Sequence, residues 1–415
     1  MPITTSAQLS KRLTFFVAFC IAIAIPLRAS GVATEQAALG LALLAAIVLA
    51  ALKPDVRARA FNAITSTQGK IVSAVFLAWA VTVPFSISPM GSLEIGGRTG
   101  LFVLAALLIW AVLRDQDDAR TFLFKALIVA ALGFAVMALL SINGVPLILS
   151  ALKGQKLASE FPVLAFKAFA AASMCLIPVM AWGGLRLGGR WAWLGFLFTP
   201  LALTMIVQTF NRSALAGALM MGLVVVALSV VHNKRAKLML GAASTLIVSS
   251  LGWLYFTEHG AQLIGGTFAP EWLIDPHRQH IWTFAFERFL EHPWVGNGID
   301  QLNRLPGAKE AVPGLASTAA QVPSHPHNWA MEILGETGLI GFLPMLAALT
   351  FVAWNLVKHY IHTGSHRALA QIALMAGFWF SALFNFSIWA VWWQLTFLIL
   401  FAVLAADRAT PENKS

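Results

Sequence analysis

The chain has 415 residues, of which 59% are hydrophobic and only 11% are charged, and its formal net charge is +10. Soluble domains carry about 25% charged residues, so this composition, with a mean hydropathy of +0.77, excludes an ordinary soluble enzyme and predicts a polytopic helical membrane protein. The positive charge does not indicate nucleic-acid binding, because the basic residues are spread over short segments between apolar runs.

Apolar runs follow one another along the chain, and we expect about twelve transmembrane helices. The first run follows Lys11 and Arg12 without a clear cleavage site, so we expect it to be retained as a signal anchor. The tenth is too long for one crossing, and a short turn near Ser387 separates the last two. The expected spans are 13–28, 33–52, 70–86, 99–113, 121–142, 162–182, 191–209, 212–231, 238–256, 329–357, 368–386 and 388–406.

The distribution of basic residues predicts the topology. With the N-terminus inside, most of the 28 Lys and Arg residues fall in inner segments, as the positive-inside rule requires. Both termini are then cytoplasmic. We expect residues 1–256 to hold spans one to nine, 257–328 to form a long outer loop with short helices that carry site residues, and 329–415 to hold the last three spans and a cytoplasmic tail.

Several kinds of site are disfavoured. Cys20 and Cys175 lie inside apolar runs, which argues against a disulfide framework or a cysteine metal site. The inner segments lack a glycine-rich loop ending in Gly-Lys-Ser/Thr, which argues against an ATP-driven step. There is no internal repeat to support an inverted-repeat transporter.

The long outer loop contains a predicted helix at 277–292, between Asp275-Pro276 and Pro293. On this helix Arg278 shares a face with Trp282 and other apolar residues, and no carboxylate lies four residues before or after it. A buried guanidinium is costly without a partner, so Arg278 needs a distant protein partner or a ligand. The alternative is an arginine that snorkels to water.

Basic residues on the outer side form a set of candidate anion ligands. Arg212 lies in the very short turn Asn211-Arg212-Ser213 between two apolar runs, where it either grips an anion or anchors the helix end. Arginine suits phosphate because its planar fork donates two parallel hydrogen bonds. The set comprises Arg98, Lys153, Lys156, Arg212, Arg278 and Arg288.

Two histidines stand where the outer loop meets the tenth span, in Ser324-His325-Pro326-His327-Asn328. We expect Pro326 to occupy the first turn of the following helix. The helix dipole would then keep His327 neutral and able to accept a proton. The alternatives are a polar helix cap and a zinc site.

A zinc site would add His277 and His280 to the two loop histidines, but the spacing matches no usual zinc pattern. The outer loops also lack an Asp-x-Asp pair for a metal. We therefore expect neither a metal nor another cofactor. Asn328, Glu332 and Glu336 share a stripe of the predicted helix, and Trp282 could stack on a sugar ring.

Together, these motifs resemble a known family. His327-Asn328, followed after nine residues by Gly338-Leu339-Ile340-Gly341, resembles the signature of bacterial O-antigen ligases. Arg278-x-x-x-Trp282, His292-Pro293-x-Val295-Gly296-x-Gly298 and Asn211-Arg212-Ser213 resemble other segments of that family. Glu336-Thr337-Gly338 also resembles the wider superfamily, which includes O-antigen polymerases. The chain lacks a threonine that some ligases carry near Gly341.

The resemblance implies a type C-like glycosyltransferase architecture and a reaction. Such an enzyme moves a glycan from undecaprenyl pyrophosphate to the lipid A-core oligosaccharide, at the periplasmic face of the bacterial inner membrane, without a metal ion. It implies that Arg212 and Arg278 hold the diphosphate and that His327 is the general base, with inversion expected. Supporting contacts would come from Asn328, Glu336 and His325 and from the remaining basic residues, Arg98, Arg288, Lys153 and Lys156.

Two other functions stay open. An O-antigen polymerase would use the same donor with a second lipid-linked repeat unit as the acceptor. A transporter of lipid-linked sugars would use the same arginines, but it predicts ionisable residues near the bilayer centre. Few are present here, and Lys167, the clearest, lies toward the outer half of its run.

Overall fold

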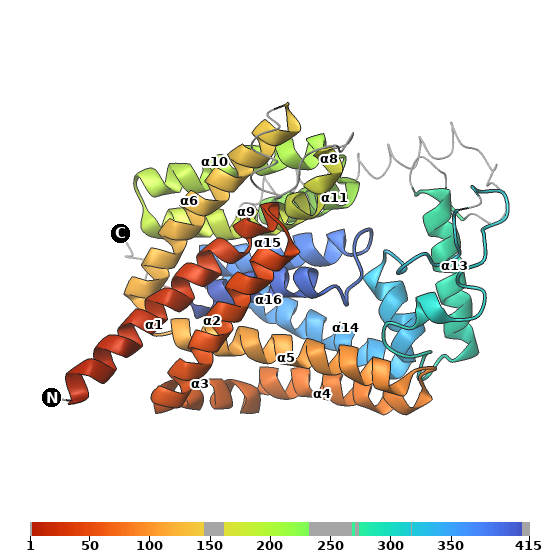
Figure 1. Cartoon of the computed structure of the whole chain (residues 1–415), viewed down its shortest axis with the longest axis horizontal. Helices are drawn as coiled ribbons and strands as arrows, with labels where there is room; N and C mark the ends of the chain where they lie inside the picture. The colour runs from red at the N-terminus through yellow and green to blue at the C-terminus, as the bar shows by residue number, and fades with distance from the viewer. Residues whose placement is uncertain (1, 145–161, 232–267, 270–273, 317, 409–415) are drawn as a thin grey trace.

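The computed structural model describes residues 2–144, 162–231, 268–269, 274–316 and 318–408. These residues form helices joined by loops, and most of the helices run along one bundle (Figure 1). The helices are α1 (Pro2–Ala24), α2 (Val32–Leu52), α3 (Pro54–Thr65), α4 (Thr67–Thr82), α5 (Pro89–Leu113), α6 (Asp117–Ile142), α8 (Pro162–Ala165), α9 (Lys167–Leu187), α10 (Arg190–Gln208), α11 (Arg212–Ser229), α13 (Pro276–Glu291), α14 (Trp329–Thr363), α15 (His366–Ser381) and α16 (Val391–Ala406), with short 3₁₀ turns at Pro26–Ala29, Val83–Phe85 and Leu302–Arg304.

The architecture confirms an all-α polytopic membrane protein. Within the described part of the chain, nine helices are long and apolar enough to cross a membrane. Helices α15 and α16 are shorter, with 16 residues each. The expected span at 238–256 lies outside the described residues, and every other expected span overlaps a described helix.

Two features of the fold differ from the sequence prediction: an additional helix and a longer loop. Helix α3 was not expected, because its mixture of charged and apolar residues has no span-like hydropathy. The turn expected near Ser387 is wrong: residues 382–390 form a longer loop between α15 and α16. This loop is mostly apolar, and hydropathy alone does not separate a buried apolar loop from a helix.

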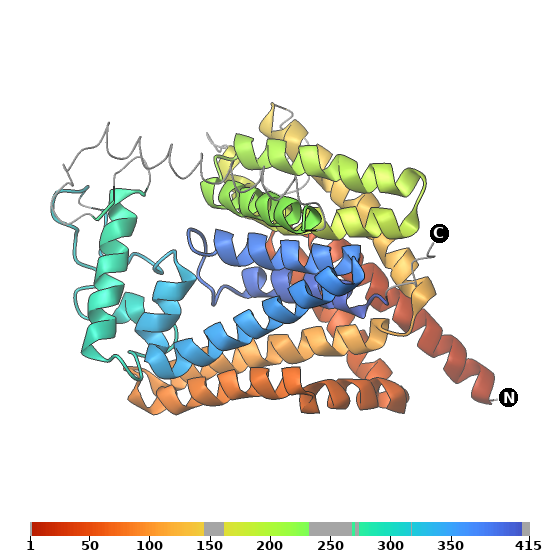
Figure 2. The ribbon, with the colours of Figure 1, turned by 180° about the vertical axis from the view of Figure 1, so that it is seen from behind.

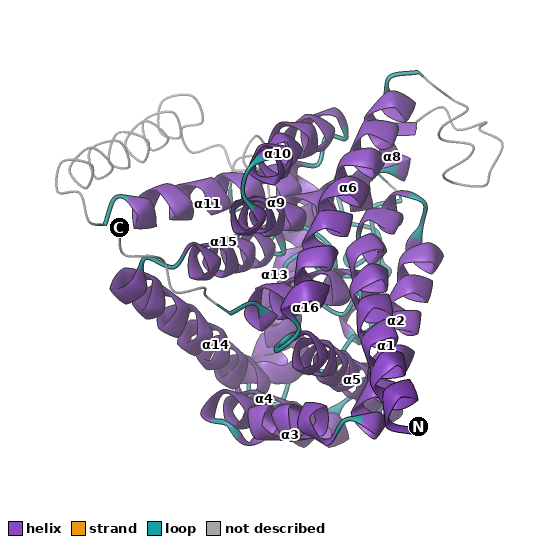
Figure 3. Cartoon of the chain, turned by 90° about the vertical axis from the view of Figure 1, so that its left-hand side faces the viewer, coloured by secondary structure: helices purple, strands orange, loops and turns teal. Residues whose placement is uncertain are grey.

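The bundle has two distinct ends. Helix α13 stands across one end, and α1 begins and α16 ends toward the other (Figure 1). Helix α4 packs against α14, α5 against α16 and α11 against α15. The reverse view shows α14 crossing the bundle above α4 and α5 (Figure 2), and the view along the bundle shows α16 in its interior (Figure 3).

The end opposite α13 is held by ion pairs. Asp407 Oδ1 lies 3.1 Å from Arg120 Nε and 2.9 Å from Arg186 Nε. Asp117 Oδ1 lies 2.9 Å from Arg120 Nη2 and 2.6 Å from Arg186 Nη2. Helices α6 and α9 are thereby joined to the end of α16, and arginines that the topology assigned to one face meet at one end of the bundle.

Helix α14 breaks at Gly338, whose φ is 58° and ψ is −165°. A Cβ on Gly338 would lie 2.4 Å from the carbonyl carbon of Trp294, so only glycine fits there. The segment 293–298 fills the break. Leu339 N donates to Pro293 O at 2.9 Å and Ile340 N donates to Trp294 O at 3.0 Å.

The same segment also binds the other side of the break. Asn297 N donates to Gly335 O at 3.1 Å, and Gly298 N donates to Glu336 O at 2.8 Å. Unpaired backbone groups cost several kcal/mol each in an apolar membrane. The segment 293–298 therefore replaces hydrogen bonds that α14 loses at its break, and it fixes the direction of the first part of α14, residues 329–337.

We expect Gly338→Ala to destabilise the protein by about 1–3 kcal/mol, because the added Cβ needs a backbone region that is essentially reserved for glycine. The change is measured as a lower melting temperature of the purified protein. Gly133→Ala in α6 is the control, since its Cβ meets no atom within 4 Å and alanine favours helix. Equal melting temperatures for both variants would contradict this account of the break.

Candidate active site

The cationic part of the site is built on the loop between α15 and α16. Arg278 Nη1 donates to the carbonyl of Phe384 at 2.7 Å. His327 Nδ1 lies 3.0 Å from the carbonyl of Asn385. Two side chains that lie far apart in the sequence therefore bind neighbouring carbonyl groups. The distant partner expected for Arg278 is a backbone oxygen.

The same loop is bound from α14 by two carboxylates. Ser387 Oγ donates to Glu332 Oε1 at 2.6 Å, and Ile388 N donates to Glu332 Oε2 at 2.8 Å. Trp389 Nε1 donates to Glu336 Oε2 at 2.6 Å. Both glutamates lie on the stripe predicted from their spacing, and both are buried. They fix the loop relative to the first part of α14.

His327 has the geometry of a general base. A carbonyl oxygen can only accept, so Nδ1 carries the proton that bonds Asn385, and Nε2 keeps its lone pair. Burial and then the charge of Arg278 lower the pKa of His327. The expected position of Pro326 in the first turn of the helix is wrong: α14 begins at Trp329 with Asn328 as its cap, so Pro326 and His327 precede the helix.

His327 is also strained, with φ at 54°. Among the described residues, the other non-glycine positions with positive φ are Phe210, next to the Asn211-Arg212 turn, and Asp300. Such backbone costs about 1–3 kcal/mol per residue and persists only where the surroundings impose it. All three strained positions fall at the candidate site or beside it.

Three cations act on this histidine or on its arginine neighbour. The charge of Arg212 helps lower the pKa of Arg278, for which burial is the larger cause, and Lys167 contributes to the lowered pKa of His327. In the described residues, none of these three cations forms an ion pair with a carboxylate. Unpaired positive charges gathered around a neutral imidazole favour an anionic ligand.

Asn211 connects two of these cations. Its Nδ2 donates to the carbonyl of Lys167 at 2.9 Å, and its Oδ1 accepts from Ala214 N at 3.2 Å, which caps α11. Asn211 is buried, whereas Arg212 and Lys167 are exposed. The turn between α10 and α11 thus holds the starts of α9 and α11 together and leaves both cationic side chains accessible.

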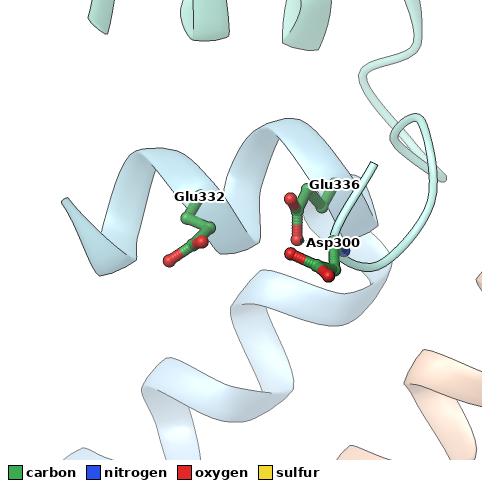
Figure 4. A group of neighbouring side chains, drawn as sticks. All are labelled: Asp300, Glu332 and Glu336. Atoms are coloured by element: carbon green, nitrogen blue, oxygen red, sulfur yellow. Dashed lines mark hydrogen bonds between the residues drawn. The ribbon is translucent and has the colours of Figure 1, made fainter. Parts of the chain in front are cut away.

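Carboxyl groups gather on the other side of the loop. Asp300, Glu332 and Glu336 each place an oxygen within 4.8 Å of the other two (Figure 4). Asp300 N donates to Glu336 Oε2 at 2.8 Å, and burial raises the pKa of Asp300. The group could hold a cation, but both oxygens of Glu332 already accept hydrogen bonds from the loop, so we assign it a supporting role.

The remaining predicted residues fall in different surroundings. Trp282 is buried and donates to the carbonyl of Pro326 at 2.9 Å, so its indole supports the histidine loop. Asn328 is buried as the helix cap. Arg288 lies about 15 Å along α13 from Arg278 and pairs with Glu291 at 2.8 Å, which separates it from the other arginines.

Arg98 belongs to the carboxyl side, since its Nη2 donates to Trp389 O at 2.8 Å and its charge acts on Asp300. His325 packs against His327 with ring centroids 4.0 Å apart, and burial followed by the charge of His327 lowers the pKa of His325 to about 3. Lys153 and Lys156 lie outside the described residues.

The sequence prediction missed Lys167 and Asp300 as site residues. Lys167 is the first residue of α9. The helix dipole disfavours a cation at that position, and this unfavourable placement is the sequence feature that could have indicated a site residue. Asp300 follows the Gly296-x-Gly298 turn, whose role becomes visible only when Gly298 contacts α14.

Comparisons with known proteins match the segment that contains several of these residues. Residues 197–346 match the family model described as O-antigen ligase. The chain is 28% identical over 151 residues to the O-antigen ligase of Pseudomonas aeruginosa, which covers 35% of this chain and 31% of that protein. It is 25% identical over 141 residues to a putative polysaccharide ligase of Rickettsia conorii, which covers 33% of this chain and 34% of that protein.

The chain thus spans about a third of the length of the curated relatives it matches. The matched residues include Arg212, Arg278, Asp300 and His327, whereas Lys167 and Arg98 lie before them. About a third of this chain is therefore similar to O-antigen ligases and polysaccharide ligases.

We expect Arg278→Gln to raise the pKa of His327, because a positive charge that disfavours the imidazolium is removed. The pKa is measured by NMR titration of ¹⁵N-histidine, with the His327 signal identified by its absence in His327→Gln. In the unchanged protein this pKa should lie below 6.5, and Nδ1 should carry the proton. Arg288→Gln on the same helix is the control and should leave the pKa in place. Equal shifts in both variants would contradict a specific effect of Arg278.

Proposed function

We propose that this protein belongs to the O-antigen ligase family and transfers a glycan from undecaprenyl pyrophosphate to the lipid A-core oligosaccharide. The proposal places the reaction at the periplasmic face of the bacterial inner membrane, with both termini in the cytoplasm, no metal ion and inversion at the anomeric carbon. The observation that carries it is His327, whose lone pair on Nε2 is free and whose neighbours include cations without carboxylate partners.

The cations Arg212, Arg278 and Lys167 bind the diphosphate of the donor. A diphosphate carries several negative charges, so it supplies the counter-charge that the described carboxylates do not. The guanidinium of Arg278 is fixed by Phe384 O, which costs the site little reorganisation when charge develops on the leaving group. Arg212 and Lys167 are exposed and able to follow the donor into the site.

The transfer is a single displacement. The acceptor hydroxyl oxygen forms a bond to the anomeric carbon while the bond from that carbon to the diphosphate oxygen breaks. The hydroxyl proton moves to Nε2 of His327, and the electron pair of the broken bond leaves with the diphosphate, where the cations stabilise it. The Nδ1–H bond to Asn385 O holds the ring in this tautomer.

Two alternative functions use the same residues. A polymerase would transfer the glycan to a second lipid-linked repeat unit. The family match and the P. aeruginosa relative support the ligase function over it. A transporter of lipid-linked sugars is disfavoured, because the strained histidine and its free lone pair serve proton transfer rather than passage.

We expect His327→Ala to lower transfer about 10²–10⁴-fold, the usual contribution of a general base. Initial rates with purified protein, lipid-linked donor and lipid A-core give the measurement. Donor binding should be retained, because the cations are unchanged. His359→Ala, at the other end of α14, is the control. A rate in His327→Ala close to that of the control would remove His327 from the chemistry.

We expect Arg278→Lys and Arg212→Lys each to weaken donor use, since an ammonium cannot form two parallel hydrogen bonds to a phosphate. The measured quantity is kcat/KM for the donor. Arg288→Lys on α13 is the control and should behave like the unchanged protein. Full activity in both site variants would mean that the arginines do not bind the diphosphate in a bidentate manner.

The same assay separates ligase from polymerase. We expect the glycan to appear on lipid A-core. Glycan chains that lengthen on the carrier while lipid A-core stays unmodified would support the polymerase instead.

A further inference from the structure

A large apolar cavity lies at the side of the bundle formed by α3, α4, α5 and α16, and its volume is about 1120 Å³. Its walls include Val72 and Phe76 of α4, Leu101 and Leu104 of α5, and Phe401 of α16. Figure 1 shows α4 and α5 side by side along this edge, reaching toward the α13 end. The cavity is outside the set of residues used in the proposed reaction.

One end of the cavity reaches the candidate site. Ile299, beside Asp300, lines it together with Ser92 and Trp79. Ser92 Oγ lies 3.3 Å from Ile299 O. Trp79 packs edge-on against Trp389 with ring centroids 5.1 Å apart, and Trp389 bonds Glu336.

Trp79 also carries a buried donor without a partner. Its side chain is 6% exposed, and its Nε1 has no hydrogen-bond acceptor among the described residues. This Nε1 is itself buried, so the indole of Trp79 forms an apolar wall at this end of the cavity.

The charges near this end differ from those that would bind the donor. Asp300, Glu332 and Glu336 lie next to the end of the cavity that Ile299 lines, and the charge of Arg98 acts on Asp300. The unpaired cations Arg212 and Lys167 belong to α11 and α9, on the other side of α14 and of loop 382–390. Glu332 and Glu336 are buried and bonded to loop 382–390, so the cations on the far side of α14 remain the site for the donor diphosphate, and the cavity on the side of α4 and α5 is left for the second lipid.

We propose that this cavity binds an acyl chain of the acceptor lipid, so that the two membrane-anchored substrates approach His327 from opposite sides of α14. The inference rests on the proposed function and names the site of its second substrate. Asn328, which follows His327 and caps α14, lies about 12 Å along that helix from Glu336. A lipid whose chain occupies the cavity therefore has room for sugar units between its anchor and the reacting hydroxyl.

Glycines in the cavity wall allow a specific test. A Cβ on Gly97 meets no atom within 4 Å, and a Cβ on Gly100 makes only ordinary contact with Phe76. These two residues lie about 8 and 12 Å along α5 from Ser92, within one leaflet of a hydrocarbon core about 30 Å thick. A side chain can therefore start from either position without a Cβ contact to the backbone, and leucine is expected to fill part of the cavity.

The first experiment measures the KM for each substrate in Gly97→Leu and Gly100→Leu. We expect the KM for lipid A-core to rise about tenfold, as the loss of contact with about two chain methylenes predicts, and the donor KM to stay unchanged. Gly133→Leu and Gly222→Leu are controls, because a Cβ at either meets no atom within 4 Å and neither lines the cavity. A selective rise in the donor KM, or no change relative to the controls, overturns the proposal.

The second experiment uses the unchanged protein, so it does not depend on how the variants fold. Lipid A-core with a photoreactive acyl chain and a photoreactive polyprenyl phosphate are each cross-linked in nanodiscs, and the labelled peptides are mapped by mass spectrometry. We expect the acyl probe to label α4 or α5 and the polyprenyl probe to label neither. The reverse pattern, or acyl labelling elsewhere only, overturns the proposal. The cross-link is read without turnover, so loss of transfer to lipid A-core counts against the proposed function alone.

Discussion

The break in α14 at Gly338 is the constraint on which the site depends. A membrane interior offers no water to backbone groups, so a helix can break there only if another segment binds the groups that it releases. Residues 293–298 do this, and glycine at 296 and 338 allows the two backbones to touch. The contact fixes the first part of α14, and with it the cap at Asn328 and the glutamates at 332 and 336.

Loop 382–390 gives the site its second fixed element. Its carbonyls accept from Arg278 and His327, while its Ser387 hydroxyl, the Ile388 amide and the Trp389 indole donate to glutamates of α14. The loop therefore separates cations from carboxylates and holds both in one geometry. Among the described residues the cations are thereby left without a carboxylate partner, while the glutamates are occupied by the loop.

Hydropathy and motif spacing were enough to predict the polytopic fold and the helix α13, and they selected His327, Arg278 and Arg212 as candidate site residues. They did not predict which groups these residues touch. In the sequence, Phe384 and Asn385 fall inside an expected span. Apolar composition does not reveal that their carbonyl groups accept hydrogen bonds from site residues. Asp300 and Lys167 were missed because their partners lie far away along the chain. The position of Pro326 was also wrong, because it precedes the cap of α14, and the burial of His327 cannot be read from the sequence.

The short length of α15 and α16 affects the effective dielectric constant around the candidate site. Each has 16 residues, about 24 Å of helix, against a hydrocarbon layer about 30 Å thick. Their loop is recessed below the ends of α4 and α5, which extend further toward α13 (Figure 1). Arg278 and His327, which bind this loop, are half-buried. In such a recess the effective dielectric constant falls, so that each unit of charge on a bound anion is attracted more strongly than it would be at a flat membrane surface.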